Sequence, residues 1–448
     1  MADKRFYTHH LFLFSLAIVA LTYIRRSIPL PLPRDAKLSL GYPNESLLNF
    51  TELTALHGYV SEEHRVITED GYILTLFRIV KAKNCHGKKR SPPVLLMHGL
   101  LLSSDVWIDS GPSSGLAYLI SDECHDLWVG NCRGNYYSRA HTSLNPDKDA
   151  QYWRFDTHEI GVYDNPAMID YILKYTGSKQ LNYVGFSQGA GTFLIMYYIL
   201  KYTGSKQLNY IGFSQGVGTF LIMCSERPGY CNKAQIMIAL APASRNLNTK
   251  SIIFRLIAGF FGKMENILEN FGVSEALSLG AFIQELGQFL CQTRMSDRLC
   301  DAALQMFDHV NDFHYGSLSN ETTRNLFGHF PAGTSVKNMA WYGQSINSPW
   351  FKRFDYGREK NLMVYGSEVP PRYNLSAATV PIMCLYGEND GLVDSKDVKW
   401  LMSQLPNVIE VTPVQCPLWN HLDMTYSRYS VDFLFPKINN YLFKYSQS

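Results

Sequence analysis

Short apolar runs recur along the chain and alternate with stretches of helical periodicity. Val94–Met97, Leu127–Val129, Gln235–Ala241 and Val380–Tyr386 are each bounded by turn or polar residues. Such runs are typical of strands that are buried on both faces of a parallel sheet. Because helical stretches separate them, the pattern predicts an α/β fold with a mostly parallel central sheet.

Further strands and helices are predicted at both ends of this pattern. Arg65–Thr68 and Tyr72–Ile79 flank Asp70-Gly71 and alternate in polarity, which indicates a β-hairpin. The C-terminal part predicts a helix from Ser395, a strand near Val408–Val411 and an amphipathic helix over Val431–Tyr445. We therefore expect the α/β core to continue to the end of the chain.

The strand–helix alternation stops between residues 247 and 375. Ile252, Leu256 and Phe260 fall on one face of a helix, and further helical stretches follow. We expect residues 247–375 to form a mainly helical insertion that interrupts the core. The core then comprises residues 56–246 and 376–448.

Residues 1–24 have the features of a signal peptide. Lys4 and Arg5 precede an apolar stretch of 14 residues, Leu11–Ile24, which is shorter than the ~20 residues that span a bilayer. No small-residue cleavage site follows, so an uncleaved anchor remains an alternative. Residues 25–55 are polar and contain several prolines, and we expect them to be a processed or loosely packed leader.

A secretory route exposes the chain to disulfide formation and to glycosylation. The chain has nine cysteines, an odd count that leaves at least one thiol unpaired. Cys291 and Cys300, nine residues apart in a polar segment, are the pair that their spacing favours. The candidate glycosylation sites are the four N-x-S/T sequons at Asn44, Asn49, Asn320 and Asn374.

Charge and cysteine spacing narrow the class of function. Lys and Arg are scattered and the net charge is +2, so the sequence has no basic footprint for nucleic acid. No cysteine spacing resembles a zinc site, and we expect no metal ion and no cofactor.

The most informative motif is LNYVGFSQG at Leu181–Gly189, where a strand-like run leads through G-x-S-x-G into a helix-like run. This layout predicts a nucleophile elbow, in which the two glycines let the hydroxyl of Ser187 project from the strand end. The motif occurs twice, because Tyr171–Met196 recurs almost unchanged as Tyr198–Met223. Ser214 is therefore a second candidate nucleophile.

A candidate acid and base follow in the order Ser, Asp390, His421, which is the order of α/β hydrolases. The histidine would take the serine proton and the aspartate would orient it. Asp394 and Asp423 are rival acids. The oxyanion needs two backbone N–H donors, and we expect them from Leu100, after the first buried strand, and from Gln188 or Gln215 after the serine. We interpret His98 as a structural brace of the oxyanion turn and Cys132 as a buried small residue.

Together these motifs resemble the acid lipase family of α/β hydrolases, which includes gastric lipase and lysosomal acid lipase. The resemblance runs from about residue 57 to the C-terminus through HGYVSEEHRVITEDGYIL, LLMHGLLLSSDVWI, DLWVGNCRGN, GFSQG, PAGTSVKNM, YGENDGLVD and NHLD. It implies hydrolysis of triacylglycerol or cholesteryl esters at a lipid–water interface by a secreted or lysosomal monomer. It also implies the roles given above for the elbow serine, Asp390, His421 and Leu100. It further implies the Cys291–Cys300 disulfide, glycosylation at Asn374 and a cap, or lid, over the site formed by the helical insertion of residues 247–375.

The chain departs from the family pattern at two points. Phe186 or Phe213 stands before the serine where histidine is usual, and the elbow is duplicated. Because a misplaced nucleophile abolishes turnover, a catalytically inactive lipid-binding or storage protein is the alternative function.

The spacing around the duplication indicates which serine is used. The resemblance to the family implies a certain spacing on each side of the serine. Ser187 has the implied spacing from Asp164 upstream, whereas Ser214 has the implied spacing to Pro242 downstream. We expect one copy to be extruded, because the register of a central parallel sheet is set by its neighbours. Surface connections tolerate insertions better than core helices, which favours Ser214.

Overall fold

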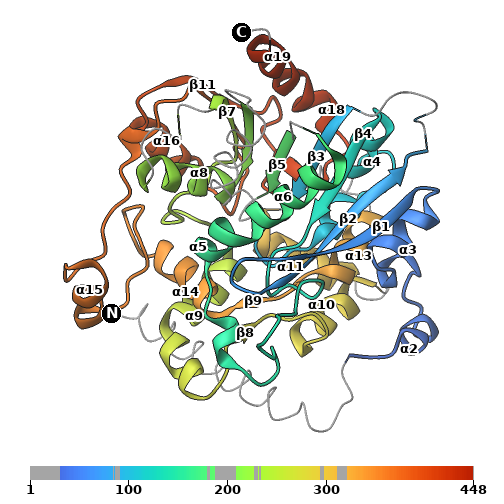
Figure 1. The fold of residues 1–448 in the computed structure, drawn as a ribbon, viewed down its shortest axis with the longest axis horizontal. Coiled ribbons are helices and arrows are strands. Elements are labelled where there is room, and N and C mark those ends of the chain that lie inside the picture. Colours follow the sequence, from blue (N-terminus) through green and yellow to red (C-terminus); the bar gives the residue numbers. More distant parts are fainter. Residues whose placement is uncertain are drawn as a thin grey trace.

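A computed structural model gives the fold, and it describes residues 31–83, 85, 91–178, 182–186, 208–226, 231, 234–292, 297–309 and 320–446. At its centre is a nine-stranded sheet in the order β1-β2-β4-β3-β5-β6-β7-β10-β11 (Figure 1). Its strands are β1 (Val60–Ile67), β2 (Ile73–Lys81), β3 (Ser91–Met97), β4 (His125–Gly130), β5 (Asn182–Phe186), β6 (Leu208–Phe213), β7 (Ala234–Leu240), β10 (Ile382–Tyr386) and β11 (Val408–Pro413). β1 and β2 pair antiparallel, as do β2 and β4, and all other neighbours are parallel. The predicted hairpin and the predicted buried strands are confirmed.

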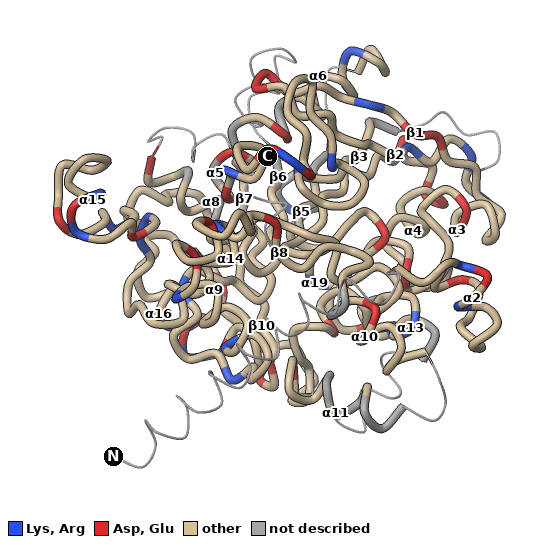
Figure 2. The backbone as a smooth tube through the Cα atoms, turned by 90° about the horizontal axis from the view of Figure 1, so that it is seen from below, with Lys and Arg blue, Asp and Glu red and all other residues tan. Residues whose placement is uncertain are grey.

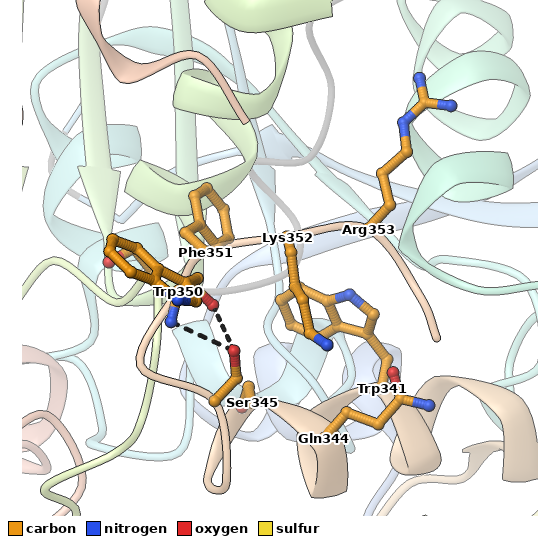
Figure 3. Close-up of a pocket in the computed structure, with 9 residues that line it drawn as sticks. Trp341, Gln344, Ser345, Trp350, Phe351, Lys352 and Arg353 are labelled. Carbon is orange, nitrogen blue, oxygen red and sulfur yellow. Dashed lines mark hydrogen bonds between the residues drawn. The ribbon is translucent and has the colours of Figure 1, made fainter. Parts of the chain in front are cut away.

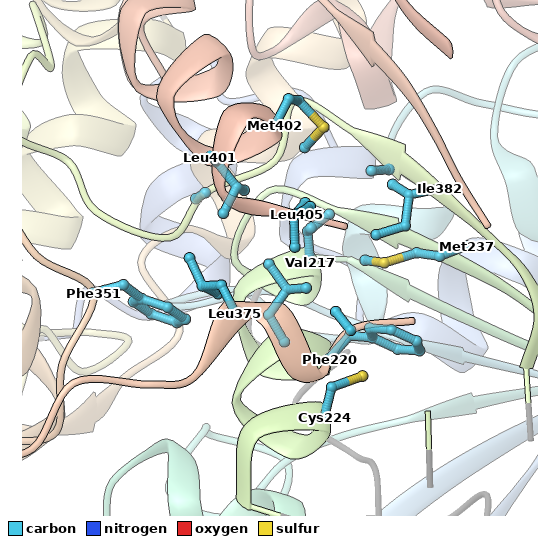
Figure 4. Packing of buried hydrophobic residues seen from close by; sticks show 14 of the residues in the cluster. Val217, Phe220, Cys224, Met237, Phe351, Leu375, Ile382, Leu401, Met402 and Leu405 are labelled. Atoms are coloured by element: carbon cyan, nitrogen blue, oxygen red, sulfur yellow. The ribbon is translucent and has the colours of Figure 1, made fainter. Parts of the chain in front are cut away.

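Both faces of the sheet are covered by helices, because successive side chains of each strand point to opposite faces. Three helices cover one face: α6 (Asn165–Thr176), α8 (Gln215–Glu226) and α16 (Ser395–Gln404). Figure 4 shows this face, where Val217 and Phe220 of α8 lie with Met237 of β7 and Leu401 of α16. The other face packs against α4 (Leu116–Asp122) and α19 (Phe435–Ser446). This double cover explains why the strands read as continuous apolar runs.

The expectation that one copy of the duplication is extruded is wrong. β5 comes from the first copy and β6 from the second, and the two pair in parallel, with Val184 opposite Ile211 and Phe186 opposite Phe213. β5 pairs with β3 on its other side, and β6 pairs with β7. Residues 187–207 connect β5 to β6, and two parallel strands need a long connection of this kind. The sheet therefore contains one strand from each copy of the repeat, and this pair of strands lies between β3 and β7.

The sequence predicts that residues 25–55 are a processed or loosely packed leader, and from Tyr42 onward loose packing is wrong. The segment forms α2 (Arg34–Ser39) and α3 (Phe50–Leu56), and the side chains of Phe50 and Leu53 are fully buried against strand residues such as Phe77. Asn49 begins α3 with a capping box, since its side chain accepts the N–H of Glu52 while the Glu52 carboxylate accepts the N–H of Asn49. Composition alone does not predict this helix, because polar capping residues surround its few apolar side chains.

Between β7 and β10 the chain is mainly helical, and Figure 1 shows most of these helices below the sheet. They are α9 (Ile252–Asn270), α10 (Phe282–Gln292), α11 (Asp297–Asp308), α13 (Asn320–His329), α14 (Val336–Ser345) and α15 (Arg358–Tyr365), with the short antiparallel strands β8 (Glu275–Ala276) and β9 (Thr334–Ser335). The remaining short helices are α5 (Thr157–Glu159), α17 (Asp423–Tyr426) and α18 (Ser430–Phe433). We call residues 247–375 the cap segment.

Charged residues of both signs are interspersed over the described part of the chain, as Figure 2 shows. None of the described helices has the length and apolar character needed to cross a bilayer. The predicted signal peptide, residues 1–24, lies outside the described residues.

Candidate active site

The second copy of the elbow places Ser214 at the end of β6. Ser214 has a φ of 55°, a left-handed conformation that is rare for serine, and α8 begins at the next residue. Its N–H donates to the carbonyl of Leu240 at 2.7 Å, and its carbonyl accepts the N–H of Ala243 at 2.9 Å. These two bonds hold the turn against the end of β7. The sharp turn matches the strand–turn–helix geometry expected of a nucleophile elbow.

Two glycines near Ser214 lie in crowded surroundings: Gly212, the first glycine of the motif, and Gly218 in α8. A β-carbon on Gly212 would lie 2.8 Å from the ring of Tyr210 and 3.2 Å from the backbone nitrogen of Val217. A β-carbon on Gly218 would lie 2.5 Å from the carbonyl oxygen of Ala243. A larger residue at Gly212 would displace the ring of Tyr210 or the start of α8, and one at Gly218 would displace the loop after β7.

Asp390 and His421 meet beyond the ends of β10 and β11. Nδ1 of His421 lies 2.8 Å from Oδ2 of Asp390, and both side chains are buried. The other oxygen of Asp390 accepts the N–H groups of Leu392 and Val393 at 2.9 and 2.7 Å. With its carboxylate held on both sides, Asp390 can fix the orientation of the imidazole.

The rival acids have other partners. Asp394 caps α16 by accepting the N–H of Lys396 at 2.8 Å, and it pairs with Lys250. Asp423 accepts the N–H of Asn420 at 2.9 Å. Of the three candidate carboxylates, the structure brings Asp390 to His421.

His421 also packs against the residue that precedes the serine. The rings of His421 and Phe213 lie 4.6 Å apart between centroids and are tilted by 35°. Phe213 is the last residue of β6, so this contact brings the imidazole to the elbow of the second copy. The aromatic residue that departs from the family pattern therefore borders the candidate base.

Asp308, at the end of α11, is a site residue that the sequence did not indicate. It is fully buried, and it accepts the N–H groups of Gly391 and Leu422, which follow Asp390 and His421. Burial and the charge of Asp390 raise its pKa to about 7. Burial alone would lower the pKa of His421, but the charges of Asp390 and Asp308 raise it above its usual value. No local signal could have revealed Asp308, because it lies far from both loops in the sequence.

The predicted oxyanion turn follows β3, and the duplication changes its position in the sheet. Leu100 lies in this turn, and its side chain packs on the cluster that contains Val217 of α8. However, β5 lies between β3 and β6, so the turn and Ser214 follow strands that are not adjacent. Neighbouring strands are ~4.8 Å apart, and the extra strand therefore widens the sheet at the site by about that distance.

His98 braces the oxyanion turn. Its Nε2 accepts the N–H of Cys132 at 3.0 Å, which leaves Nδ1 to donate to the carbonyl of Gly99 at 2.8 Å. Burial lowers the pKa of His98 to about 4, so the ring is neutral. Cys132 is a buried free cysteine, and burial raises the pKa of its thiol. Gln215 begins α8 directly after Ser214, whereas Ser187 and Gln188 lie outside the described residues.

The structure joins Cys291 to Cys300 and contains two further disulfides, Cys85–Cys124 and Cys224–Cys231. The last two join segments whose spacing gave no signal. Cys132, Cys384 and Cys416 are free.

Three of the four sequon asparagines, Asn44, Asn49 and Asn374, are exposed, and the side chain of Asn320 lies outside the described residues. Glycosylation at all four positions stays a prediction.

The cap segment borders two cavities that the candidate catalytic residues do not line. Figure 3 shows one beside Trp341, Trp350 and Phe351, with a volume of about 10 Å³, which holds at most one water. An open cleft of about 570 Å³ is bordered by α9, α14 and residues 347–357, and its lining is mixed, with Lys263 and Asp355 beside Trp350. The lining of neither includes Ser214, Asp390 or His421.

Comparison with known proteins gives a consistent result. Residues 50–111 match the partial α/β-hydrolase lipase region, and residues 92–198 match the α/β hydrolase fold. Lipase 1 of Drosophila melanogaster is 38% identical over 88% of this chain and 80% of its own length. Gastric triacylglycerol lipase of Homo sapiens is 35% identical over 87% and 89%. Lysosomal acid lipase/cholesteryl ester hydrolase of Macaca fascicularis is 32% identical over 90% and 92%.

Proposed function

Because this chain belongs to the acid lipase family and has the α/β hydrolase fold, we propose that it is a lipase that hydrolyses carboxylic esters of neutral lipids. Its substrates are triacylglycerols or cholesteryl esters at a lipid–water interface. Ser214, Asp390 and His421 act as nucleophile, acid and base. The observation that carries the proposal is the Asp390–His421 pair, whose imidazole packs on Phe213 beside the elbow of Ser214.

The reaction follows from the hydrogen bonds of His421. Its Nδ1–H donates to Asp390, which leaves Nε2 free of a proton and able to accept one from the Ser214 hydroxyl. The serine oxygen attacks the ester carbonyl, and His421 returns the proton to the departing alcohol. Water then hydrolyses the acyl-serine by the same steps in reverse. The N–H of Gln215 and the N–H of Leu100 are the proposed donors to the oxyanion. The extra strand β5 holds the Leu100 turn back from Ser214, which weakens the second of these donors.

Several features support Ser214 over Ser187. β6 is the copy that pairs with β7, and β7 is the neighbour of β10, whose end leads to Asp390. α8, which follows Ser214, is tied to the start of the next strand by the Cys224–Cys231 disulfide, and the first copy has no equivalent cysteine.

The remaining assignments are proposals on the same basis. Residues 247–375 form a cap over a core of residues 56–246 and 376–448. The three disulfides agree with passage through the secretory pathway to a secreted or lysosomal location. We propose that the protein acts as a monomer.

A fluorophosphonate probe tests the catalytic proposal directly. We expect the folded protein to be labelled at Ser214, and the Ser214→Ala variant to lose both labelling and ester hydrolysis. Ser187→Ala is the matched control and should retain both. Absence of labelling on folded wild-type protein would refute the enzyme, and loss of labelling in Ser187→Ala alone would transfer the role of nucleophile to Ser187.

One observation favours a second function, a catalytically inactive lipid-binding or storage protein. The extra strand β5 separates the strand of the oxyanion turn from the strand of Ser214. A protein of this kind would bind a fluorescent lipid ester, as measured by transfer of the ester from vesicles to the protein. It would release no fatty acid from an emulsified ester. Release of fatty acid by the wild-type chain rejects this alternative.

A further inference from the structure

The end of α11 in the cap segment is bonded to both catalytic loops. Oδ1 of Asp308 accepts the N–H of Gly391 at 2.9 Å, and Oδ2 accepts the N–H of Leu422 at 2.7 Å. Gly391 follows Asp390, and Leu422 follows His421. One carboxylate therefore links the loop of the acid to the loop of the base.

The backbone at this point adds a second link to each loop. The side-chain amide of Asn420 donates to the carbonyl of Asp308 at 2.9 Å. The side-chain amide of Asn389 donates to the carbonyl of His309, also at 2.9 Å. Asn389 and Asn420 directly precede Asp390 and His421, so each catalytic residue lies between two residues that are bonded to the end of α11.

The stability of α11 does not explain a carboxylate at position 308. The side chain is fully buried and stands at the C-terminal end of its helix, where the helix dipole disfavours negative charge. The nearby charge of Asp390 disfavours it further. What favours ionised Asp308 is the pair of loop N–H groups together with the positive charge that His421 acquires.

We propose that Asp308 is a positioning residue that holds the acid loop and the base loop in register and presents a second negative charge to His421. This inference rests on the proposed function, because it assigns Asp308 to the Ser214–Asp390–His421 site. It also makes the geometry of the site depend on the cap segment, since Asp308 is the residue through which α11 contacts both loops.

The charge of Asp308 has a measurable consequence for pH dependence. The ionisable groups that act on His421 are Asp390 in the acid loop and Asp308 on α11, and Asp423 on α17 and His309 are close in sequence to this pair. A carboxylate facing an imidazole favours the protonated ring, which cannot accept the serine proton. Removing the charge of Asp308 should therefore extend activity to lower pH.

The test compares Asp308→Asn and Asp308→Ala in the full chain on a soluble ester, with kcat/KM and kcat measured against pH. Both variants remove the charge, so the acid limb of the pH–rate profile should shift to lower pH in both. On the alkaline plateau both should lose kcat, and Asn should lose less because its one oxygen still accepts one of the two N–H groups. Asp397→Asn is the control, since Asp397 is also buried and accepts the N–H of Asn248 at 2.8 Å, but its charge is not among those that act on His421. It should keep the wild-type limb.

An unchanged acid limb in both variants overturns the proposal, as does an equal shift in Asp397→Asn. If the wild-type chain hydrolyses nothing, the proposed function fails, and the titration of the His421 ring proton by NMR, assigned with His421→Gln, still decides. Its midpoint should move to lower pH in Asp308→Asn. If neither variant folds, the wild-type ring proton should titrate in more than one step, because the charges of Asp308 and His421 act on each other. A single step then overturns the proposal.

Discussion

Asp390 is held so that only one of its oxygens faces His421. Leu392 and Val393 both donate to Oδ1, while Oδ2 receives the imidazole. An amide at this position would keep its oxygen toward the two N–H groups and turn its nitrogen toward the ring. Nδ1 would then have to accept, and the ring proton would move to Nε2, where the serine proton has to go.

Asp390→Asn should therefore fold normally and lose about 10⁴-fold in kcat, by analogy with the same change in serine protease triads. The measurement is turnover of a soluble nitrophenyl ester, with circular dichroism to establish folding. Asp394→Asn is the control and should keep near-normal activity, because Asp394 caps α16. The reverse outcome would show that Asp394 is the acid.

At the scale of elements, the duplicated strand is the main unusual feature of the sheet. β5 and β6 occupy two positions between β3 and β7. Deleting residues 171–197 leaves one complete repeat, because Asp170 is then followed by Tyr198-Ile199 instead of the identical Tyr171-Ile172. β6 should then pair with β3 on one side and with β7 on the other, which brings the Leu100 turn next to Ser214.

We expect kcat of this deletion variant to rise by roughly 10²–10³-fold, the effect of one oxyanion donor. The assay is fatty acid release from an emulsified ester, and the deletion variant carrying Ser214→Ala is the inactive control. Unchanged or lower activity in a folded deletion variant would mean that the oxyanion turn already serves Ser214 in the nine-stranded sheet.

The Cys291–Cys300 disulfide acts on the element that carries Asp308. It joins the end of α10 to α11 across a short loop. In the chain-entropy treatment, Cys300→Ser should lower the free energy of unfolding by about 2–3 kcal/mol. Urea unfolding measures this loss, and Cys416→Ser, which removes a free cysteine, is the control. If peptide mapping without reductant finds Cys291 and Cys300 as free thiols, the bridge is not formed.

At the scale of the whole molecule, buried carboxyls make stability depend on pH. Burial raises the pKa of Asp109 and Asp164 to about 6 and that of Glu265 and Asp308 to about 7. These groups bind protons in the folded state before the unfolded state does, so stability increases as pH falls through this range. His329 acts in the same direction, because the charges of Asp105 and Asp109 outweigh burial and raise its pKa to about 10. His98 opposes them, since its pKa is lowered to about 4.

The melting temperature should therefore be higher near pH 5 than near pH 8. Differential scanning calorimetry across this range tests it, and Glu265→Gln should reduce the difference by removing one of the contributing carboxyls. A melting temperature that falls steadily from pH 8 to pH 5 would contradict the net direction.

Much of the fold and part of the site could be predicted from local sequence. The hairpin at Asp70-Gly71, the buried strands and the order of Ser214, Asp390 and His421 depend on residue types and on spacings within short segments. The helix at Phe50–Leu56 could not be recognised, because its stability comes from packing on β2 and neighbouring strands and not from its own composition.

What the sequence by itself determined is the identity of the strands, the elbows and the ordered candidates for acid and base, because each is written in neighbouring residues. Only the tertiary structure decided that both copies of the repeat enter the sheet, that His421 lies against Phe213 and that Asp308 joins the loops of Asp390 and His421. These outcomes depend on pairing between distant segments. Two nearly identical strands offer the same hydrogen bonds to a neighbour, so their order is settled by the connections and by the packing of the whole sheet.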